Sequence, residues 1–268
     1  MRAADYGYFD APFLAFAHRG GATYPANLGR ENTLHAFEQA AKLGYRYFET
    51  DVHATADGVL VAFHDDRLDR VTDRTGRVGE LPYRELSRAR IGGVDPIPTF
   101  DELLDAFPDV RFNVDAKSDA AVPLLADAIR RHRAAGRVCV SSFGVARLHR
   151  LRRLLGPETP TAASQAGIAW NRFAPRLTRL LNTGGAALQL PVRHRVAGRE
   201  VTVLTPRLIE AVHRAGKQVQ AGLDRGGVPE RHPAPGRRHG EHDRQGSGTC
   251  RPESPERDHG GDDDADPE

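Results

Sequence analysis

Two histidines of the chain stand where short apolar segments end, and both could transfer protons near neutral pH. His18 follows the apolar residues 13–17 and is itself followed by Arg19 and two glycines. His64 follows the apolar residues 59–63. Imidazole gains and loses a proton near neutral pH, and a guanidinium can form two parallel hydrogen bonds with a phosphate. Each histidine alone also fits a structural or surface role, but if the two loops converge the sequence predicts an acid/base pair beside a phosphate-binding cation.

Three acidic residues are placed so that they share a face of the expected strands. Glu49 and Asp51 are two residues apart. Asp115 alternates in the same way with Asn113 and Lys117, so each set projects from one face of its strand. Like charges on a buried face repel each other unless a cation compensates them, and carboxylate oxygens are suitable ligands for Ca2+ or Mg2+. The sequence therefore predicts a divalent-metal site made by the three acids, with Lys117 as a second cation for phosphate.

Other interpretations of these acidic residues stay open. The first two could be solvated acids on an exposed edge strand, although Tyr47 and Phe48 before them favour burial. The third could form a buried ion pair with Lys117 without binding a metal. His53 shares the spacing of the strand acids and could be structural or could face the substrate.

A hard divalent cation, two histidines, an arginine and a lysine together suit one kind of chemistry. Hydrolysis of a phosphodiester requires that charge on the phosphate oxygens is neutralised while protons move to and from other oxygens. The residues also follow or end apolar strands, which is where β/α-barrel enzymes place their active sites. The pattern therefore indicates an enzyme that acts on a phosphodiester.

Apolar segments and segments with helical periodicity alternate along most of the chain. Strands are expected at residues 13–17, 47–52, 59–63, 111–115, 138–141 and 187–190, and helices at residues 33–42, 99–106, 122–132, 145–155, 174–181 and 206–215. This α/β alternation favours a (β/α)8 TIM-type barrel, with a doubly wound sheet as the alternative. No GxGxxG turn follows the first strand, which weighs against a dinucleotide-binding sheet.

Composition and charge exclude two classes of protein. The net charge is +2 with 28% charged residues, so nothing marks the chain as a nucleic-acid binder, and 39% apolar residues suffice for a core. No apolar segment approaches the roughly 20 residues that span a bilayer, and the N-terminus lacks the pattern of a secretory signal. We therefore expect a cytoplasmic protein without a membrane span. Cys139 and Cys250 belong to no CxxC pair and are expected to be incidental thiols.

The C-terminal part of the chain differs from the rest in composition. From residue 217 onward the only large aliphatic or aromatic side chains are those of Val219, Leu223 and Val228. Such a segment cannot bury enough surface to offset the entropy lost on ordering. The sequence therefore predicts an N-terminal lead at residues 1–12, a barrel domain at residues 13–220 that is incomplete at its last strands, and a disordered tail at residues 221–268.

Seven short motifs follow one another between residues 13 and 219. They are His18-Arg19-Gly20, Glu31-Asn32-Thr33, Glu49-Thr50-Asp51, Asp57-Gly58 with His64-Asp65, Leu68-Asp69-Arg70, Ile97-Pro98-Thr99 and Asp115-Ala116-Lys117. In order and spacing they resemble the glycerophosphodiester phosphodiesterase family. The resemblance implies a (β/α)8 barrel with an insertion after the second strand, at about residues 53–96. It also implies a phosphoric diester hydrolase that cleaves a small glycerophosphodiester into sn-glycerol 3-phosphate and an alcohol with the help of a divalent metal.

Eight residues match positions that have a role in that family. The resemblance implies that the acid/base pair is His18 and His64, that the metal ligands are Glu49, Asp51 and Asp115, and that phosphate or substrate contacts come from Arg19, Asn32 and Lys117. Asp115 stands where the family usually has a glutamate, and its shorter side chain could draw the ion toward its own strand. In the family's mechanism the glycerol 2-hydroxyl attacks phosphorus, and water opens the resulting cyclic phosphate.

The resemblance ends near Val219. The family's chain continues with a strand ending in Trp-Thr, a helix with Leu-Leu and a final strand ending in Thr-Asp, and none of these follows here. Codons read one nucleotide later from Leu223 onward permit all three features, so we expect that a frameshift replaced the last strands. The sequence therefore leaves two alternative functions open. One is an active metal-dependent phosphodiesterase, with sphingomyelinase D-like release of the cyclic product as a variant. The other is a non-catalytic or weakly active remnant whose open sheet edge associates with other chains.

Overall fold

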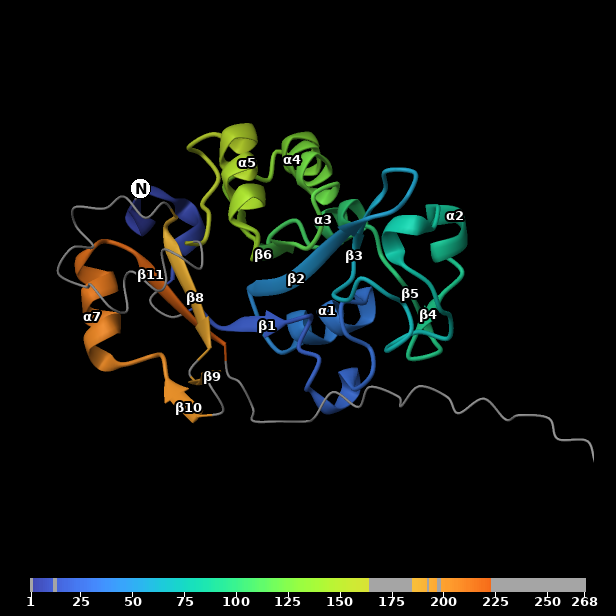
Figure 1. Ribbon diagram of the computed structural model, residues 1–268, viewed down its shortest axis with the longest axis horizontal. Coiled ribbons are helices and arrows are strands. Elements are labelled where there is room, and N and C mark those ends of the chain that lie inside the picture. The colour runs from blue at the N-terminus through green and yellow to red at the C-terminus, as the bar shows by residue number, and fades with distance from the viewer. Residues whose placement is uncertain (1, 12–13, 164–184, 192, 197–198, 223–268) are drawn as a thin grey trace, which may run out of the picture. The chain divides into compact units, whose positions relative to one another are not determined.

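The computed structural model describes residues 2–11, 14–163, 185–191, 193–196 and 199–222 of the chain. Four strands of its main sheet are parallel and have the order β1-β2-β6-β7 (Figure 1). The strands are β1 (Phe16–His18), β2 (Tyr47–Ala54), β6 (Arg111–Ala116) and β7 (Val138–Ser141). Because parallel strands are joined by crossovers, their carboxyl ends lie along the same edge of the sheet.

The parallel arrangement continues beyond β7. Isolated parallel bridges join Val140 to Thr161 and Ala162 to Ala187. From there β8 (Ala187–Pro191) pairs in parallel with β11 (Gln218–Gly222). This succession is the order of strands in a β/α barrel. Within the described residues no strand joins β11 to β1, so that part of the chain shows no closed ring.

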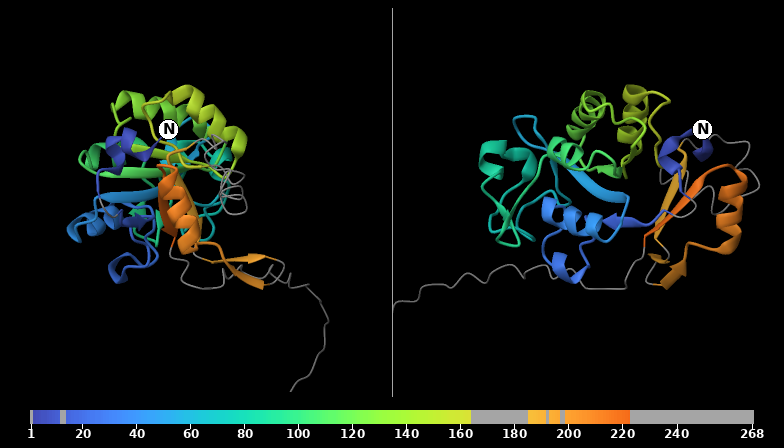
Figure 2. Two further views of the ribbon diagram at one scale, coloured as in Figure 1. Left: turned by 90° about the vertical axis from the view of Figure 1, so that its left-hand side faces the viewer. Right: turned by 180° about the vertical axis from the view of Figure 1, so that it is seen from behind.

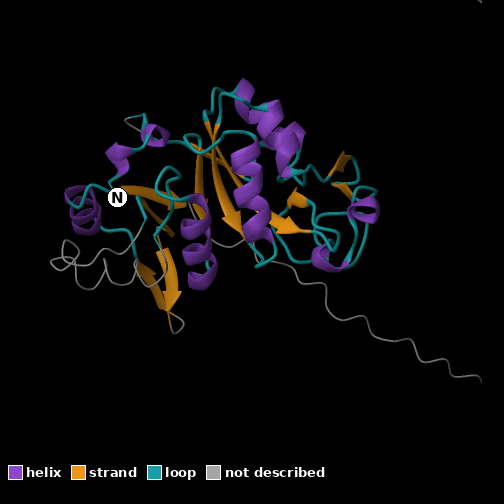
Figure 3. Ribbon diagram, turned by 90° about the horizontal axis from the view of Figure 1, so that it is seen from above, coloured by secondary structure: helices purple, strands orange, loops and turns teal. Residues whose placement is uncertain are grey.

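Helices connect the strands, as the sequence predicted. They are α1 (Leu34–Lys42), α3 (Phe100–Ala106), α4 (Ala121–Arg131), α5 (Val145–Leu155) and α7 (Pro206–Arg214). The hydroxyl oxygens of Thr33 and Thr99 accept hydrogen bonds from the third residue of α1 and of α3, and these bonds set the starts of the two helices. Helices α4 and α5 lie side by side, as two views show (Figures 1 and 3).

Aromatic side chains fill the space between the helices and the main sheet. Phe37 of α1, Phe48 of β2 and Phe112 of β6 are fully buried. The ring centroids of Phe37 and Phe48 are 5.1 Å apart, and those of Phe48 and Phe112 are 5.8 Å apart, which is the range of favourable aromatic contacts. Because neighbouring residues of a strand face opposite ways, this core directs the acidic residues of β2 and β6 to the other face of the sheet.

The insertion after β2 has a core of its own. A tight turn at Asp57-Gly58, where Gly58 has a φ of 81°, reverses the chain so that β3 (Leu60–Ala62) runs antiparallel to β2. The strand expected at residues 59–63 is therefore present, but it belongs to the insertion and not to the parallel series. The insertion continues with α2 (Tyr83–Leu86), β4 (Arg90–Ile91) and β5 (Asp95–Pro96). Its core consists of Val61, Phe63, Leu68, Val78, Leu86, Ala89, Ile91 and Ile97.

The N-terminal residues pack at the amino ends of the strands. They form two short 3-10 helices, η1 (Ala3–Asp5) and η2 (Gly7–Phe9), and the ring of Tyr8 in η2 packs edge-on against Tyr47 at the start of β2. The hydroxyl of Tyr47 donates a hydrogen bond of 2.8 Å to the carbonyl of Tyr8. The lead therefore covers the end of the sheet opposite to the predicted site.

Some expectations fall at the limits of the described residues. The helix expected at residues 174–181, Cys250 and the tail beyond residue 222 lie outside them. Ala221 and Gly222, which the composition assigned to the tail, form the end of β11. A hairpin of β9 (Arg193–Val196) and β10 (Arg199–Thr202) was not expected (Figure 2). Among the described helices, none combines the length and the hydropathy that crossing a bilayer requires. The domain boundaries and the cytoplasmic location stay predictions.

Candidate active site

Three neighbouring strands bring the predicted residues to one edge of the sheet. In the register of the sheet, His18 lies opposite Glu49, which lies opposite Asn113. Asp51 lies opposite Asp115 in the same way. All three acids project from the face that is turned away from the aromatic core. The pairing of β2 with β6 thus brings together acids that are more than 60 residues apart in the chain.

Lys117 lies between two of these carboxylates. Its Nζ is 2.8 Å from Asp51 Oδ1 and 2.7 Å from Asp115 Oδ2. Burial acts to lower the pKa of Lys117, but the charges of the two carboxylates raise it above its usual value. The ammonium therefore stays charged at neutral pH. This is the ion pair that the sequence left open as an alternative for Asp115.

Among the described residues, no lysine or arginine side chain pairs with Glu49 in this way. Its Oε2 accepts a hydrogen bond of 3.0 Å from the backbone N–H of Arg19 and lies 3.7 Å from His18 Nε2. Burial, followed by the charge of Asp51, raises the pKa of Glu49 to about 8. A carboxyl group with such a pKa keeps its proton at neutral pH unless a cation stabilises the ionised form.

Within the part of the chain that the structure describes, two carboxylate oxygens of the site have no hydrogen-bond partner. They are Asp51 Oδ2 and Asp115 Oδ1, and both are buried. Arg19 Nε lies 3.6 Å from Asp51 Oδ2, too far for a hydrogen bond, and is itself buried without one. Because buried polar atoms are normally paired, this face has the capacity for a further cation or ligand.

The loop after β1 holds two of the predicted residues in an uncommon backbone conformation. Arg19 and Asn32 have φ values of 49° and 58°, and such strain in non-glycine residues is concentrated at functional sites. Arg19 Nη1 donates a hydrogen bond of 3.2 Å to Glu31 Oε1. Asn32 Oδ1 accepts one of 2.9 Å from the hydroxyl of Thr50, which leaves the buried Asn32 Nδ2 without a partner.

His64 follows β3 and is oriented by the next residue. Its Nδ1 is 2.6 Å from Asp65 Oδ1. Burial acts to raise the pKa of Asp65, but hydrogen bonds from His64 and Arg70 lower it well below its usual range. Asp65 is therefore ionised and must accept, so Nδ1 of His64 carries the proton of this bond. In the neutral ring Nε2 is then the proton acceptor.

The two predicted acid/base residues come within electrostatic reach of each other. Loss of water around the ring and then the Arg19 charge lower the pKa of His18, and His64 adds to this effect. The His18 side chain is still 66% exposed, so it can meet a ligand from solvent. His53, by contrast, is buried with its Nε2 3.2 Å from the backbone oxygen of His64, which favours the structural interpretation of that residue.

This arrangement corresponds to a known family. The model of the family described as "Glycerophosphoryl diester phosphodiesterase family" matches residues 18–221. The chain belongs to this family. A Mycobacterium tuberculosis (strain ATCC 25618 / H37Rv) protein named "Probable glycerophosphodiester phosphodiesterase 2" is 39% identical over 220 residues, which are 78% of each chain. A glycerophosphodiester phosphodiesterase of Caldanaerobacter subterraneus subsp. tengcongensis is 32% identical over 144 residues, 48% of this chain and 58% of that one.

Solved structures of glycerophosphodiester phosphodiesterases have a similar fold. A phosphodiesterase of Oleispira antarctica, solved in complex with the product sn-glycerol-3-phosphate, has a TM-score of 0.66 at 24% identity and covers 81% of this chain and 87% of its own. One from Agrobacterium tumefaciens str. C58 has a TM-score of 0.61 at 23% identity and covers 77% and 84%. The predicted TIM-barrel-like α/β fold and the class of phosphoric diester hydrolase are thus confirmed for this family member.

Sequence reasoning missed several residues that support the site. Arg70 was recognised only as part of a motif, although it hydrogen-bonds Glu31 and Asp65 together. Gln189 of β8 was not considered, yet its Nε2 donates to Asn113 Oδ1 at 2.6 Å and to Gln220 Oε1 at 2.8 Å. Both glutamines alternate with apolar residues on their strands, and this pattern was the signal that could have identified them.

The donor set of the site fits a hard divalent cation. Three carboxylates share one face, two of their oxygens are unpaired, and the charge of Asp51 opposes ionisation of Glu49. In the described part of the chain, no three His, Cys, Asp or Glu side chains are already close enough to hold an ion together. Lys117 occupies the space between Asp51 and Asp115. Together, Glu49, Asp51 and Asp115 would supply the oxygen ligands that Ca2+ or Mg2+ prefers.

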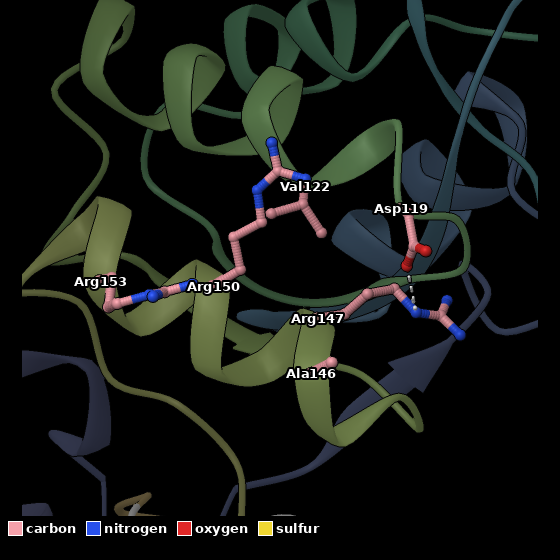
Figure 4. A pocket seen from close by; sticks show the side chains of 6 residues that line it. All are labelled: Asp119, Val122, Ala146, Arg147, Arg150 and Arg153. Atoms are coloured by element: carbon pink, nitrogen blue, oxygen red, sulfur yellow. Dashed lines mark ion pairs between the residues drawn. The ribbon is translucent and has the colours of Figure 1, made fainter.

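A separate surface cavity of about 220 Å³ lies at α4 and α5. It is lined by Asp119, Val122, Ala146, Arg147, Arg150 and Arg153, and Arg147 Nε forms an ion pair of 3.2 Å with Asp119 (Figure 4). None of these lining residues is a histidine or a cysteine. The cavity therefore lacks the acid/base chemistry that the strand ends provide.

Proposed function

We propose that this chain hydrolyses glycerophosphodiesters to sn-glycerol 3-phosphate and an alcohol, with a divalent metal ion held by Glu49, Asp51 and Asp115. The observation that carries the proposal is the strand register, which gathers these acids, His18 and Lys117 at one edge. The family match supports the choice of reaction, and the Oleispira antarctica phosphodiesterase with sn-glycerol-3-phosphate supports the choice of product.

The cations of the site suit a phosphate group. Arg19 offers a guanidinium whose Nε has no hydrogen bond, and Lys117 offers an ammonium beside the acids. A bound Ca2+ or Mg2+ would neutralise further charge on the phosphate oxygens. Asn32 Nδ2, a buried donor without a partner, can give one hydrogen bond to the substrate.

The two histidines divide the proton transfers between them. His64, with its Nδ1–H held by Asp65, accepts at Nε2 the proton of the glycerol 2-hydroxyl while that oxygen bonds to phosphorus. His18 gives a proton to the alcohol oxygen as its bond to phosphorus breaks. Water then opens the cyclic phosphate, with the roles of the two histidines reversed, and the enzyme returns to its starting protonation.

The test measures release of glycerol 3-phosphate from glycerophosphocholine. His18→Ala and His64→Ala should each lower kcat by about 10² to 10⁴, the usual contribution of a positioned proton-transfer group. The matched control is His149→Ala, because His149 is exposed on α5. Chelation should abolish turnover and added Ca2+ or Mg2+ should restore it. Wild-type activity in either folded variant, or in the chelated enzyme, contradicts the proposal.

A weakly active chain is the second candidate function, and one observation favours it. The family match ends at residue 221, two residues before Leu223, from which we propose that the reading frame is shifted. Sequencing of the gene across the codons for residues 218–222 tests the frameshift directly. Expression of the chain with the frame restored tests the function. We expect the restored chain to unfold at a higher temperature and to turn over faster, and equal stability and turnover of the two chains would contradict this candidate.

A further inference from the structure

One guanidinium connects the insertion to the loop after β1. Arg70 Nε donates to Asp65 Oδ2 at 2.6 Å, and its Nη2 donates to Asp65 Oδ1 at 3.1 Å. The same side chain reaches Glu31, with Nη1 3.1 Å from Oε2 and Nη2 2.6 Å from Oε1. Arg70 thus binds each of the two carboxylates through two hydrogen bonds.

Each of these carboxylates in turn holds one of the proposed functional side chains. Asp65 accepts the hydrogen bond from His64 Nδ1 at 2.6 Å. Glu31 accepts the hydrogen bond from Arg19 Nη1 at 3.2 Å. The chain of contacts therefore runs from the proposed base, through Arg70, to a proposed phosphate-binding cation.

We propose that Arg70 is a positioning residue, which holds Asp65 and Glu31 in place and thereby orients His64 and Arg19 toward the same phosphate. This inference rests on the proposed function of the site. In the described part of the chain, Arg70 is the residue that hydrogen-bonds both carboxylates, and the insertion containing it is otherwise built around a separate core.

An arginine is required for this role because of its geometry. Its planar group presents donors in a fixed fork that fits two carboxylates at once, whereas the ammonium of lysine is a point charge. The Arg70 side chain is 40% exposed, but Glu31 and Asp65 are only 13% and 23% exposed. The network is therefore less screened by water than an isolated surface pair.

The first test separates kcat from KM. Arg70→Gln and Arg70→Lys should lower kcat by about 10- to 100-fold, as loss of a group that orients functional side chains usually does. KM should rise by less than kcat falls, because Arg70 does not itself bind substrate and acts on binding only through the orientation of Arg19. Arg67→Gln is the matched control, since Arg67 lies in the same insertion and pairs with Asp69 at the surface. Its activity should stay within about 2-fold of wild type.

The second test keeps the proposal falsifiable if the variants are destabilised. Arg70→Gly removes the guanidinium and leaves space, so added methylguanidinium should restore part of kcat. The double variant Arg70→Gln with Asp65→Asn should be no slower than the slower single variant by more than about 2-fold, because both changes break the same contact chain. A purely structural role predicts neither rescue nor this lack of additivity.

Several results would overturn the proposal. They are wild-type kcat in Arg70→Gln, an increase in KM with unchanged kcat, additive effects in the double variant, or no response of Arg70→Gly to methylguanidinium. The proposed function fails separately, through wild-type activity of His64→Ala. If His64→Ala is inactive while Arg70→Gln is fully active, only the role of Arg70 is wrong.

Discussion

Two sets of carboxylates in this protein have opposite electrostatic surroundings. The sheet carboxylates are Glu49, Asp51 and Asp115, and the arginine-paired carboxylates are Glu31, Asp65 and Asp95. In the first set a single ammonium serves two acids, the pKa of Glu49 is raised to about 8, and two oxygens lack partners. In the second set each acid binds a guanidinium through two hydrogen bonds or contacts.

This difference distinguishes the carboxylates that would bind a ligand from those that hold the surrounding segments in place. Acids that share too few cations within the protein are costly to ionise and gain most from a further cation. Acids that already bind a guanidinium gain nothing from a further ion, and they hold the loops that carry them in fixed positions. We therefore expect changes in the sheet carboxylates to act on metal binding and turnover, and changes in the other set to act on orientation and stability.

The largest effect should come from Asp51→Asn. This change removes a charged ligand from the sheet carboxylates, so kcat/KM should fall by about 10³-fold, or about 4 kcal/mol of transition-state stabilisation. A calorimetric titration of the metal-free protein with Ca2+ or Mg2+ should show the matching loss of affinity. The control is Asp127→Asn, because Asp127 pairs with Arg130 at the surface of α4. If Asp51→Asn left the metal affinity unchanged, the sheet carboxylates would not be a metal site, and their contrast with the arginine-paired carboxylates would not bear on function.

Loss of a guanidinium from the second set should reduce stability. Arg30 pairs with Asp95 in a two-pronged contact, one part of which is 2.7 Å from Nη2 to Oδ1, and the two side chains are 26% and 13% exposed. Arg30→Met leaves Asp95 unpaired and partly buried, so the free energy of unfolding should fall by about 2 kcal/mol. Thermal or urea unfolding measures this change. An unchanged unfolding midpoint in Arg30→Met would show that the Arg30–Asp95 ion pair does not stabilise the protein.

Removal of a charge from the sheet carboxylates should increase the stability of the metal-free protein, whereas Arg30→Met should decrease it. The pKa of Glu49 is about 8 in the folded protein and 4.5 as its ordinary value, so the folded state binds the proton more tightly between these values. The stability that Glu49 contributes is complete below about pH 4.5 and is lost as the pH rises through about 8. Glu49→Gln should therefore raise the metal-free melting temperature at pH 9 by about 2 to 6 °C.

The same variant at pH 5 should melt close to wild type, because Glu49 is protonated there in the folded protein. Glu38→Gln serves as the control for a lost charge at an exposed site of α1. If Glu49→Gln lowered the melting temperature at pH 9, the sheet carboxylates would not be short of cations, and the contrast between the two sets would be wrong.

The smallest effect is expected where pairing occurs without burial. Arg67 and Asp69 form a contact of 3.1 Å, but their side chains are 47% and 39% exposed. Arg67→Met should leave the free energy of unfolding nearly unchanged, because water and salt screen the pair. Comparison of its urea midpoint with that of Arg30→Met measures how much burial adds. Equal losses in both variants would show that burial is irrelevant here.

Local patterns were enough to predict the faces of the strands. The alternation around Glu49 and Asp51 and around Asp115 places these acids opposite the aromatic core, and the register confirms that placement. The strand at residues 59–63 was also predicted, but its antiparallel direction was not, although the Asp57-Gly58 turn before it is the usual signal of a hairpin with the preceding strand. The site roles of all eight predicted residues stay predictions.

The sequence by itself determined which side chains share a face, since the period of a strand is a local property of the backbone. It also determined the family, through motifs whose order survives without any coordinates. Only the tertiary structure decided which charges meet. Strand register places Lys117 between Asp51 and Asp115. The way the insertion folds back onto the sheet lets Arg70 join Asp65 to Glu31. The contacts of Lys117 with Asp51 and of Arg70 with Glu31 join residues that are 66 and 39 positions apart in the chain, and their geometry results from the packing of the whole core, which no local pattern encodes.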